Sequence, residues 1–419
     1  MRCSIIIPDG GAQTTAAQLR RLVPDGAAAG GPVAEIIAQV RDGGDQALRR
    51  LITKYDTHGS EPMALRVTAA EMAAALSALD KAVADGLRLA AANVGRVAAA
   101  QTAAATTVDF PHHSVTIREV AVKHAAVYVP GGRAPYPSTV VMGVATARAA
   151  GVTDVAVCAP PGPGGDINAT ILAAAALTGA DVVYRMGGAQ AIAALAIGTE
   201  TVTPVDVIVG PGNLYVQEAK RQLSGLVGID SFAGPSDLLA IIDSDQPVEP
   251  VALDLLAQGE HGPGTLVVGV STDLDLLVAV ERRIATELPD SEAICRLVHV
   301  PDLHYAFELA QAFAPEHLEL LGQEAEQLAP RITTAGCVFI GTGTAFGDYI
   351  AGSNHTLPTG GAARFASTLG AHHFRRVYSE VRIADADALA RAAVPIARAE
   401  GFELHARSME SRISQNPSK

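Results

Sequence analysis

Residues 255–263 contain two side chains that can bind a metal ion, Gln258 and His261. The apolar residues before them have helical spacing, and Gly262-Pro263 stops a helix, so both side chains are expected on one face of its last turn. An amide oxygen and an imidazole nitrogen on one face make half of a metal site. A single Gln-x-x-His pair is not decisive, because a histidine at a helix end more often faces the helix dipole or packs in the core. The other ligands would have to come from distant segments.

Glu316 and His317 place an acid beside a histidine in a segment where alternate residues are otherwise apolar. A histidine of near-neutral pKa can accept the proton of an alcohol, and an adjacent carboxylate can activate water. This dipeptide is therefore a candidate acid–base pair. An exposed charged pair at the entrance to a strand explains the local pattern equally well.

A polar loop at residues 347–361 interrupts an otherwise hydrophobic region. It contains Asp348, His355 and several glycines. Functional residues concentrate on such loops, because a rigid scaffold can position them there. Asp348 and His355 are thus further candidate functional residues.

The elements that must position these residues alternate between strands and helices, which predicts parallel sheets covered on both faces. We expect two similar Rossmann-like α/β units with the natural ligand site in the crevice between them. In the first series, strands are predicted near 126–129, 153–158, 181–185 and 206–209, and helices near 138–150, 167–178, 188–197 and 213–222. In the second, strands are predicted near 238–242, 265–270, 296–300 and 334–340, and helices near 248–260, 273–287 and 302–313.

Two glycine-rich turns in the first series are candidates for binding phosphate groups. Pro130-Gly131-Gly132 and Gly210-Pro211-Gly212-Asn213 each follow a strand and precede a helix, so their amides and a helix N-terminus can face an anion. Such turns are also glycine-rich for steric reasons alone. The sequence has no Gly-x-Gly-x-x-Gly after a predicted strand, so the usual dinucleotide fingerprint is missing.

The two ends of the chain differ from this alternating pattern. Residues 1–24 read as an irregular arm, and 32–55 and 68–102 read as long helices, the second with a capping box made by Thr68 and Glu71. After residue 370 a helical tail carries Glu400 and His405. The tail has an apolar stripe at helical spacing, which needs a surface to cover it, either a partner or its own chain.

Length and composition restrict the class of protein. The chain has 419 residues, 49% of them hydrophobic, which predicts more than one domain with a large core. Its formal charge of −13 and the lack of basic runs argue against nucleic acid as a partner. No run of 18 apolar residues and no signal segment is present, so we expect no membrane insertion and a cytoplasmic location. Four scattered cysteines give no disulfide framework or thiolate metal site.

Taken together, these segments resemble the histidinol dehydrogenase family over nearly the whole chain. Several long motifs carry the resemblance, and chance agreement at all of them in order is not credible. They are Tyr128-Val129-Pro130-Gly131-Gly132-Arg133-Ala134 with Tyr136-Pro137-Ser138, Gly187-Gly188-Ala189-Gln190-Ala191, Val209-Gly210-Pro211-Gly212-Asn213, Ala233-Gly234-Pro235-Ser236, Gln258 with Glu260-His261, Pro315-Glu316-His317-Leu318-Glu319, and Gly347-Asp348-Tyr349 through Pro358-Thr359.

The resemblance implies an enzyme that oxidises the amino alcohol L-histidinol through the aldehyde to L-histidine, using zinc and two NAD⁺. It implies zinc ligands Gln258, His261, Asp348 and His405, and the catalytic pair Glu316 and His317. The implied substrate contacts are Ser236, Gln258, His261, His317, Asp348, His355, Glu400 and His405, and the implied cofactor contacts are Tyr128, Gln190 and Asn213. Two imidazoles, an amide and one carboxylate would leave the zinc site about one unit positive, which suits binding of a substrate's nitrogen atoms.

The resemblance also implies a homodimer with shared active sites, because the family takes the residues matching Glu400 and His405 from the partner subunit. We therefore divide the chain into an N-terminal helical arm (1–24), a first α/β domain with the metal and catalytic residues (25–127 and 236–369), a second α/β domain that binds NAD (128–235) and a C-terminal dimerisation tail (370–419).

Some positions depart from the family's usual pattern and leave the substrate open. Gly259 stands where alanine is common, Asp237 replaces a glutamate, and residues 143–147 replace an Asn-x-x-Pro-Ala run. The alternatives are a family member that oxidises another small polar primary alcohol with the same machinery, and a metal-dependent binding protein without turnover. Retention of the acid–base pair disfavours the latter, since a pure binder needs no proton transfer.

Overall fold

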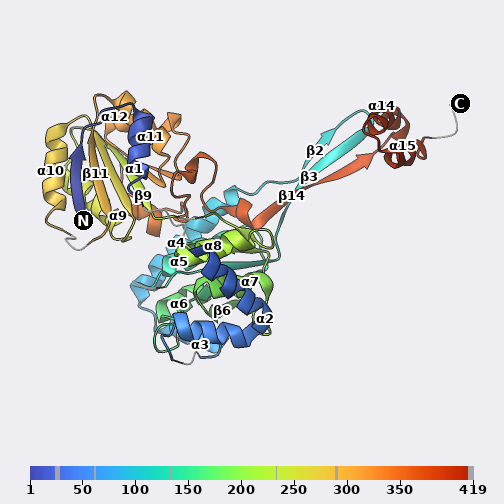
Figure 1. Ribbon diagram of the computed structural model, residues 1–419, viewed down its shortest axis with the longest axis horizontal. Coiled ribbons are helices and arrows are strands. Elements are labelled where there is room, and N and C mark those ends of the chain that lie inside the picture. The colour runs from blue at the N-terminus through green and yellow to red at the C-terminus, as the bar shows by residue number, and fades with distance from the viewer. Residues whose placement is uncertain (24–28, 61–62, 132–133, 233, 288–290, 414–419) are drawn as a thin grey trace. The chain divides into compact units, whose positions relative to one another are not determined.

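The computed structural model describes residues 1–23, 29–60, 63–131, 134–232, 234–287 and 291–413. It divides into two compact units. Unit 1 comprises Met1–Gln101 and Val122–Phe374, and unit 2 comprises Thr102–Ala121 and Arg375–Lys419. Figure 1 shows two parallel sheets with their covering helices in unit 1. The predicted turn residue Gly132 and the motif residues Arg133 and Ala233 lie outside the described residues.

Sheet A of unit 1 has six parallel strands in the order β1-β11-β10-β9-β12-β13. Every residue of β9 and β10 is buried, as expected for strands covered on both faces. The strands are β1 Arg2–Ile6, β9 Asp237–Ile242, β10 Leu266–Ser271, β11 Ile294–His299, β12 His317–Leu321 and β13 Cys337–Ile340.

Helices cover both faces of sheet A and bury separate cores. α1 and α11 pack on one face, and α9 and α10 pack on the other. The helices are α1 Ala12–Arg20, α9 Val248–Gly259, α10 Leu274–Ile284 and α11 Leu303–Phe313, and shorter segments follow as α12 Gln323–Glu326, α13 Ala345–Tyr349 and the 3-10 turns Ala329–Arg331, Ala362–Arg364 and Ala371–Phe374.

Sheet B of unit 1 has five parallel strands in the order β6-β5-β4-β7-β8. Counted from its own first strand, it has the same order, 3-2-1-4-5, as strands β9 to β13 of sheet A. The prediction of two similar Rossmann-like units is therefore confirmed. The elements are β4 His124–Tyr128, α5 Pro137–Ala149, β5 Asp154–Ala159, α6 Ala169–Thr178, β6 Val182–Arg185, α7 Gly188–Ile197, β7 Val207–Val209, α8 Leu214–Leu223 and β8 Gly228–Ile229.

The helices within residues 30–100 also cover sheet B, so assigning 25–127 to the domain of 236–369 was wrong. α2 Gly30–Tyr55 shares a core with α7 and α8, whereas α3 Ala69–Ala78 packs on α6 and α4 Lys81–Ala100 packs on α5. The sequence shows that these helices are amphipathic but not which sheet receives them. The segment 68–102 forms two helices rather than one, and the predicted capping box of Thr68 and Glu71 is confirmed.

The N-terminal segment is not an irregular arm, which corrects the prediction for residues 1–24. β1 is the edge strand of sheet A and pairs with β11, where Cys3 faces Cys295 with 2.7 Å between the Sγ atoms. α1 buries Leu19 in the same domain, and full burial of a leucine stabilises by about 2 kcal/mol. The strand was missed because its partner lies far away in the sequence and its apolar run is short.

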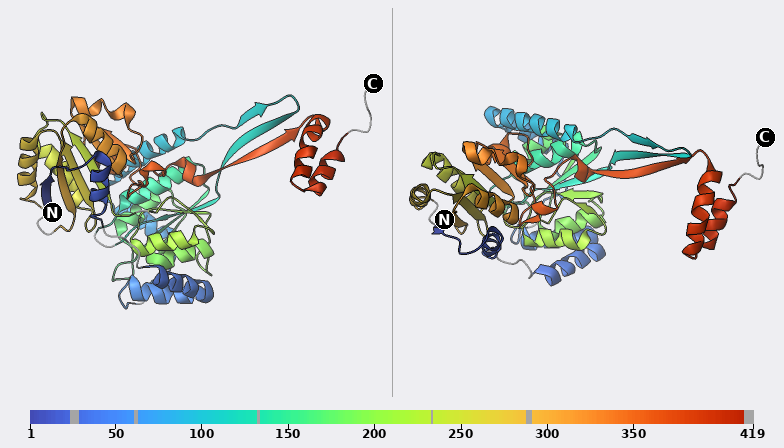
Figure 2. Two further views of the ribbon diagram at one scale, coloured as in Figure 1. Left: turned by 45° about the horizontal axis from the view of Figure 1, so that its top comes forward. Right: turned by 90° about the horizontal axis from the view of Figure 1, so that it is seen from above.

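Unit 2 is a three-stranded antiparallel sheet followed by two helices (Figure 2). Its elements are β2 Thr106–Asp109, β3 His113–Ala121, β14 Arg375–Ile383, α14 Ala386–Ala399 and α15 Glu403–Glu410. β3 pairs with β14 along its whole length. The predicted tail boundary at 370 therefore moves to 375, and the tail includes a sheet whose other strands come from 102–121.

Within the described ranges, no helix is long and apolar enough to cross a membrane.

Candidate active site

Glu316 and His317 stand at the start of β12, in the interior of sheet A. Both are buried, with exposed fractions of 6% and 2%, which removes the alternative of an exposed pair. Glu316 Oε2 accepts hydrogen bonds from Ser236 Oγ (2.5 Å) and from the Asp237 amide (2.9 Å). The carboxylate is thus fixed by the residues that begin β9.

Burial and neighbouring charges shift the proton affinity of this pair. Burial raises the pKa of Glu316 to about 7, against the opposing effect of His317. Burial alone would lower the pKa of His317, but the carboxylates of Glu316 and Asp348 raise it to about 9. The imidazole lies between them, with Nδ1 3.7 Å from Glu316 Oε2 and Nε2 3.5 Å from Asp348 Oδ1. This arrangement stabilises the protonated, imidazolium form of His317.

Gln258 is joined to the same cluster through Ser236. Its Nε2 donates to Ser236 Oγ (2.5 Å), while its Oε1 is buried and makes no hydrogen bond within the described part of the chain. His261 lies two residues beyond the end of α9, and its Nδ1 is 3.0 Å from the Gln258 carbonyl oxygen. If Nδ1 carries the proton, Nε2 is left as an acceptor or metal ligand.

Asp348 and His355 complete the part of the site that unit 1 contains. Burial by itself would raise the pKa of Asp348, but His317, then His355 and His261, lower it. Burial lowers the pKa of His355 to about 4, so its imidazole is neutral at neutral pH, and the buried Nε2 has no hydrogen bond to the described residues. One carboxylate is therefore ionised among three imidazoles.

Within unit 1 the structure brings together seven of the predicted metal, catalytic and substrate residues. The seven are Ser236, Gln258, His261, Glu316, His317, Asp348 and His355. Glu400 and His405 belong to unit 2, where both are exposed and the His405 ring lies tilted against that of Phe402, with 5.3 Å between the ring centroids. In the described residues, no three His, Cys, Asp or Glu side chains form a complete metal site.

The three predicted cofactor contacts line one cavity of about 700 Å³ at the carboxyl ends of the strands of sheet B. Tyr128 ends β4, and its hydroxyl accepts a hydrogen bond from the Gly188 amide (3.1 Å). Gln190 lies in the first turn of α7, and Asn213 caps α8. Gly131, from the first predicted phosphate turn, lines the same cavity.

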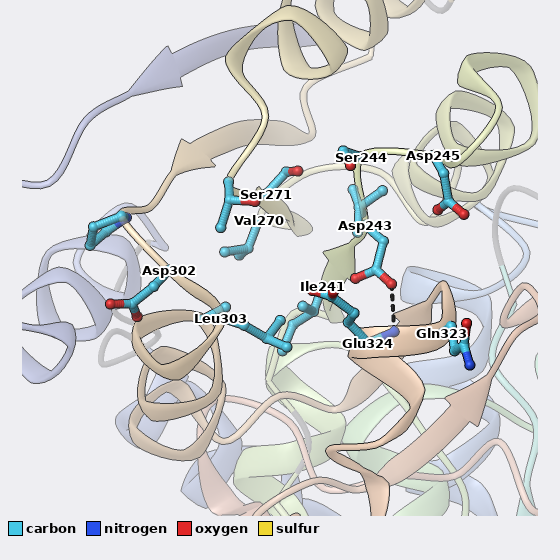
Figure 3. A pocket seen from close by; sticks show the side chains of 14 residues that line it. Ile241, Asp243, Ser244, Asp245, Val270, Ser271, Asp302, Leu303, Gln323 and Glu324 are labelled. Carbon is cyan, nitrogen blue, oxygen red and sulfur yellow. Dashed lines mark hydrogen bonds between the residues drawn. The ribbon is translucent and has the colours of Figure 1, made fainter.

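A second cavity, of about 520 Å³, lies at the carboxyl ends of β9 and β10 in sheet A (Figure 3). It is lined by acidic residues such as Asp243, Asp245 and Asp302, and Asp243 accepts a hydrogen bond from the Glu324 amide (2.7 Å). None of the predicted site residues lines it. Glu316 and His317 lie at the opposite, amino edge of the same sheet.

Asp237 is a site residue whose role the sequence did not reveal. Its Oδ1 accepts from the Glu316 amide (2.7 Å), and its Oδ2 pairs with Arg20 Nη1 (2.6 Å). Asp237 thus fixes the backbone at Glu316 and links α1 to the site. The available signal was a carboxylate at the head of a fully apolar strand, because a buried charge needs a partner.

Two parallel Rossmann-like sheets, a buried acid–base pair and a large cavity at a carboxyl edge are typical of an α/β enzyme that binds a nucleotide. The comparisons give the family. A family model described as histidinol dehydrogenase matches residues 21–413. The histidinol dehydrogenase of Parasynechococcus marenigrum is 42% identical over 399 residues, covering 92% of this chain and 91% of that protein, and that of Agrobacterium fabrum is 41% identical over 401 residues, covering 91% and 92%.

A solved structure agrees with this assignment. The histidinol dehydrogenase of Elizabethkingia anophelis is 30% identical, covers 98% of both chains and superposes with a TM-score of 0.90. The chain belongs to the histidinol dehydrogenase family and is an NAD-dependent oxidoreductase that acts on a CH–OH group.

Proposed function

We propose that this enzyme oxidises L-histidinol to L-histidine through the aldehyde, with zinc in the site and two NAD⁺ consumed per substrate. The observation that carries the proposal is the connected cluster of Gln258, Ser236, Glu316, His317 and Asp348. It combines ligand atoms with a buried acid–base pair, which a binding protein would not need.

In the first oxidation, the neutral form of His317 accepts the hydroxyl proton while the carbon loses a hydride. Because the pKa of His317 is about 9, this form is a minor fraction at neutral pH and grows as the pH rises. The flanking carboxylates of Glu316 and Asp348 favour this step, because they stabilise the imidazolium that forms. Tyr128, Gln190 and Asn213 would hold NAD⁺, which would supply the hydride acceptor for both oxidations.

In the second oxidation, Glu316 removes a proton from a water molecule as the water oxygen attacks the aldehyde carbon. The resulting hydrate then loses a hydride and a proton to become the carboxylic acid. The pKa of Glu316, raised by burial to about 7, suits a base that must be partly ionised near neutral pH yet hold a proton well.

The donor atoms in unit 1 fit a zinc ion. The buried Gln258 Oε1 has no partner among the described residues, His261 can offer Nε2, and the pKa of Asp348 is lowered, so its carboxylate is ionised. Oxygen and imidazole donors of this kind suit zinc. The partner subunit's His405 would supply the fourth ligand. Bound zinc would position the substrate's nitrogen atoms and polarise its oxygen.

The departures from the family pattern do not favour another substrate. At Gly259 a Cβ would lie 2.9 Å from Met1 Sδ, and at Gly143 it would lie 2.5 Å from Val127 Cγ1. Both glycines therefore accommodate core packing. Asp237 contacts Arg20 and the Glu316 backbone. Oxidation of another small polar primary alcohol therefore remains the second candidate function. The proposed substrate contacts Ser236 and His355 would serve either substrate.

The decisive experiment measures NADH formed per L-histidinol consumed by the purified, zinc-loaded enzyme. The proposal predicts two NADH formed per L-histidinol consumed. One NADH with accumulation of the aldehyde would contradict the two-step assignment. Turnover only with another primary alcohol would support the second candidate, and zinc-dependent binding of histidinol without turnover would identify a binding protein.

We further propose a homodimer whose active sites combine both chains. Unit 2 exposes large apolar side chains, with exposed fractions from 50% to 75% at Val377, Val381, Ile383, Ile396, Phe402 and Leu404. Exposed apolar groups at this density are typical of an interaction surface. Part of the predicted apolar stripe of the tail is covered within unit 2, where α14 packs Val394 and Ala397 near Ala406 of α15. Ile396 is left exposed.

Mixing two inactive variants tests the shared site. His405→Asn and His261→Asn would each inactivate their own homodimers, but a mixed dimer would contain one doubly defective site and one intact site. After subunit exchange, activity should return to about a quarter of wild type, because about half of the dimers are mixed. Demonstrated exchange without recovery would show that His405 serves its own chain or no site.

A further inference from the structure

Among the described residues that line the cavity of sheet B, one carries a carboxylate, Asp56, which none of the sequence motifs includes. Asp56 is the C-cap residue of α2, and its amide donates to the Ile52 carbonyl (2.8 Å). The end of this helix therefore directs an acidic side chain into a cavity that also contains Tyr128, Gln190 and Asn213.

The carboxylate of Asp56 is held in place but still has unused acceptor positions. Oδ2 accepts from the Gly187 amide (3.0 Å), and Gln190 Nε2 lies 3.3 Å from both oxygens. A carboxylate can accept about four hydrogen bonds, so about two positions are open to a ligand. A ligand with two neighbouring hydroxyl groups would donate one hydrogen bond to each of these two open positions.

The position of Asp56 corresponds to a known requirement of dinucleotide binding. In such sheets an acid near the end of the second strand binds the hydroxyl groups of the adenosine ribose. Here the second strand, β5, is followed by Pro160-Pro161, which have no side-chain acceptor. A Cβ atom built on Gly187 would lie 2.5 Å from Pro160 Cβ and 3.1 Å from Asp56 Oδ1. Pro160 and Asp56 therefore both lie next to Gly187. Asp56 therefore reaches the end of β5 from a different element.

Charge in the cavity discriminates between two cofactors. Among the described residues that line it, none is lysine or arginine, and His58 is the one titratable base. A 2′-phosphate would bring up to two negative charges beside the Asp56 carboxylate, and no lysine or arginine among the described lining residues would neutralise them. A free 2′-hydroxyl would instead donate a hydrogen bond to it.

We propose that Asp56 binds the ribose hydroxyl groups of the nucleotide and excludes a 2′-phosphate, so that this residue sets the preference for NAD over NADP. The inference rests on the proposed function in one respect, namely that the cavity of sheet B is the cofactor site.

The test measures dissociation constants of NADH and NADPH by nicotinamide fluorescence, with the zinc-loaded wild-type enzyme and with Asp56→Asn. Wild type should prefer NADH strongly. Asp56→Asn should weaken NADH binding about tenfold or more, as expected for loss of hydrogen bonds to a charged group. It should also reduce the preference for NADH over NADPH by a similar or larger factor. In turnover, the change should be in KM for the cofactor, with kcat changed little.

A matched control separates ligand binding from support of the fold. Asp45 also lies in α2 and accepts hydrogen bonds from Thr199 and Thr201, yet it does not line the cavity. Asp45→Asn should lower stability but leave the NADH preference within about twofold of wild type, because it removes a structural hydrogen bond only.

The outcomes distinguish the inference from the proposed function. Three results would overturn the role of Asp56. They are an unchanged preference for NADH over NADPH in Asp56→Asn, an equal loss of that preference in Asp45→Asn, and no binding of either nucleotide. A wild-type enzyme that prefers NADH but does not oxidise histidinol would contradict the proposed function and leave the role of Asp56 intact if Asp56→Asn removes the preference.

Discussion

Sheets A and B have the same strand order, but their candidate sites lie at opposite edges. In sheet B the cavity with Tyr128 and Gln190 is at the carboxyl edge, where nucleotides bind in open parallel sheets. In sheet A the buried pair Glu316 and His317 is at the amino edge. Under the proposed assignment, the shared topology does not determine where each site lies, and the residues at each edge do.

The difference has an electrostatic explanation. The carboxyl edge of sheet A also has a cavity, but Asp243, Asp245 and Asp302 line it (Figure 3), and they would repel the phosphates of a dinucleotide. The described lining of the sheet B cavity has a single carboxylate, Asp56, and glycines that allow close backbone approach. One sheet is thus suited to the cofactor, and the other to proton transfer and metal binding.

The largest expected effect comes from the acid–base pair at the amino edge of sheet A. His317→Asn should lower kcat by about 10²–10⁴ for both alcohol and aldehyde, because His317 is the residue proposed to take the hydroxyl proton in each oxidation. Glu316→Gln should slow aldehyde oxidation more than alcohol oxidation, since a neutral amide cannot activate water. Rates measured with each substrate separate the two roles. Equal losses for both variants on both substrates would remove this division of labour.

Loss of a proposed ligand at the same edge should be the next largest effect. His261→Asn or Asp348→Asn should weaken zinc binding by tens of fold or more, with activity falling in parallel. Metal content by mass spectrometry after dialysis against a buffered zinc concentration is the measurement. Asp245→Asn, at the carboxyl edge, is the control and should keep its zinc. Full zinc content and full turnover in either ligand variant would show that the ligand assignment is wrong.

A smaller effect, dependent on pH, is expected at the carboxyl edge of sheet B. Burial raises the pKa of Asp56 to about 6. Above pH 6 the carboxylate is ionised and should exclude a 2′-phosphate, whereas below pH 6 it is protonated and the preference for NADH over NADPH should decline. The 2′-phosphate itself titrates with a pKa of about 6, so Asp56→Asn is needed as a reference.

Binding titrations from pH 5 to pH 8 measure this effect. The wild-type preference should change with pH more steeply than that of Asp56→Asn. Parallel pH profiles for the two proteins would assign the whole effect to the nucleotide and remove Asp56 from the explanation.

The smallest effect is expected at the carboxyl edge of sheet A. Asp245→Asn removes a carboxylate from the acidic cavity but should change kcat and the KM for NAD by less than about twofold, as is usual for an exposed residue remote from the site. Steady-state kinetics decide this. A marked fall in the KM for NAD would mean that the cofactor approaches this edge, and the proposed difference between the two sheets would be wrong.

The sequence predicted much of this arrangement because the alternation of strands and helices is a local pattern. Strands such as β5 and β9 and the capping box at Thr68 were found in this way. The assignment of α2, α3 and α4 to sheet B was missed, as was β1, because both depend on contacts with distant segments.

The candidate site shows the same limit. Its motif residues, including Glu316 and His317, were found from residue type and from the family resemblance. Asp237 and Asp56 were not given a role, because their function depends on partners, Arg20 in one case and Gly187 in the other, that only the folded chain brings near. A single carboxylate has no periodic pattern that would distinguish it in the sequence.

The most direct test of the central claim is a crystal structure of the enzyme with zinc and NAD⁺, using anomalous scattering at the zinc edge. We expect one zinc peak per chain within bonding distance of Gln258, His261 and Asp348, at the amino edge of sheet A, and cofactor density in the cavity lined by Tyr128, Gln190 and Asp56. Zinc at another place, or cofactor density in the acidic cavity at the carboxyl edge of sheet A, would contradict the account.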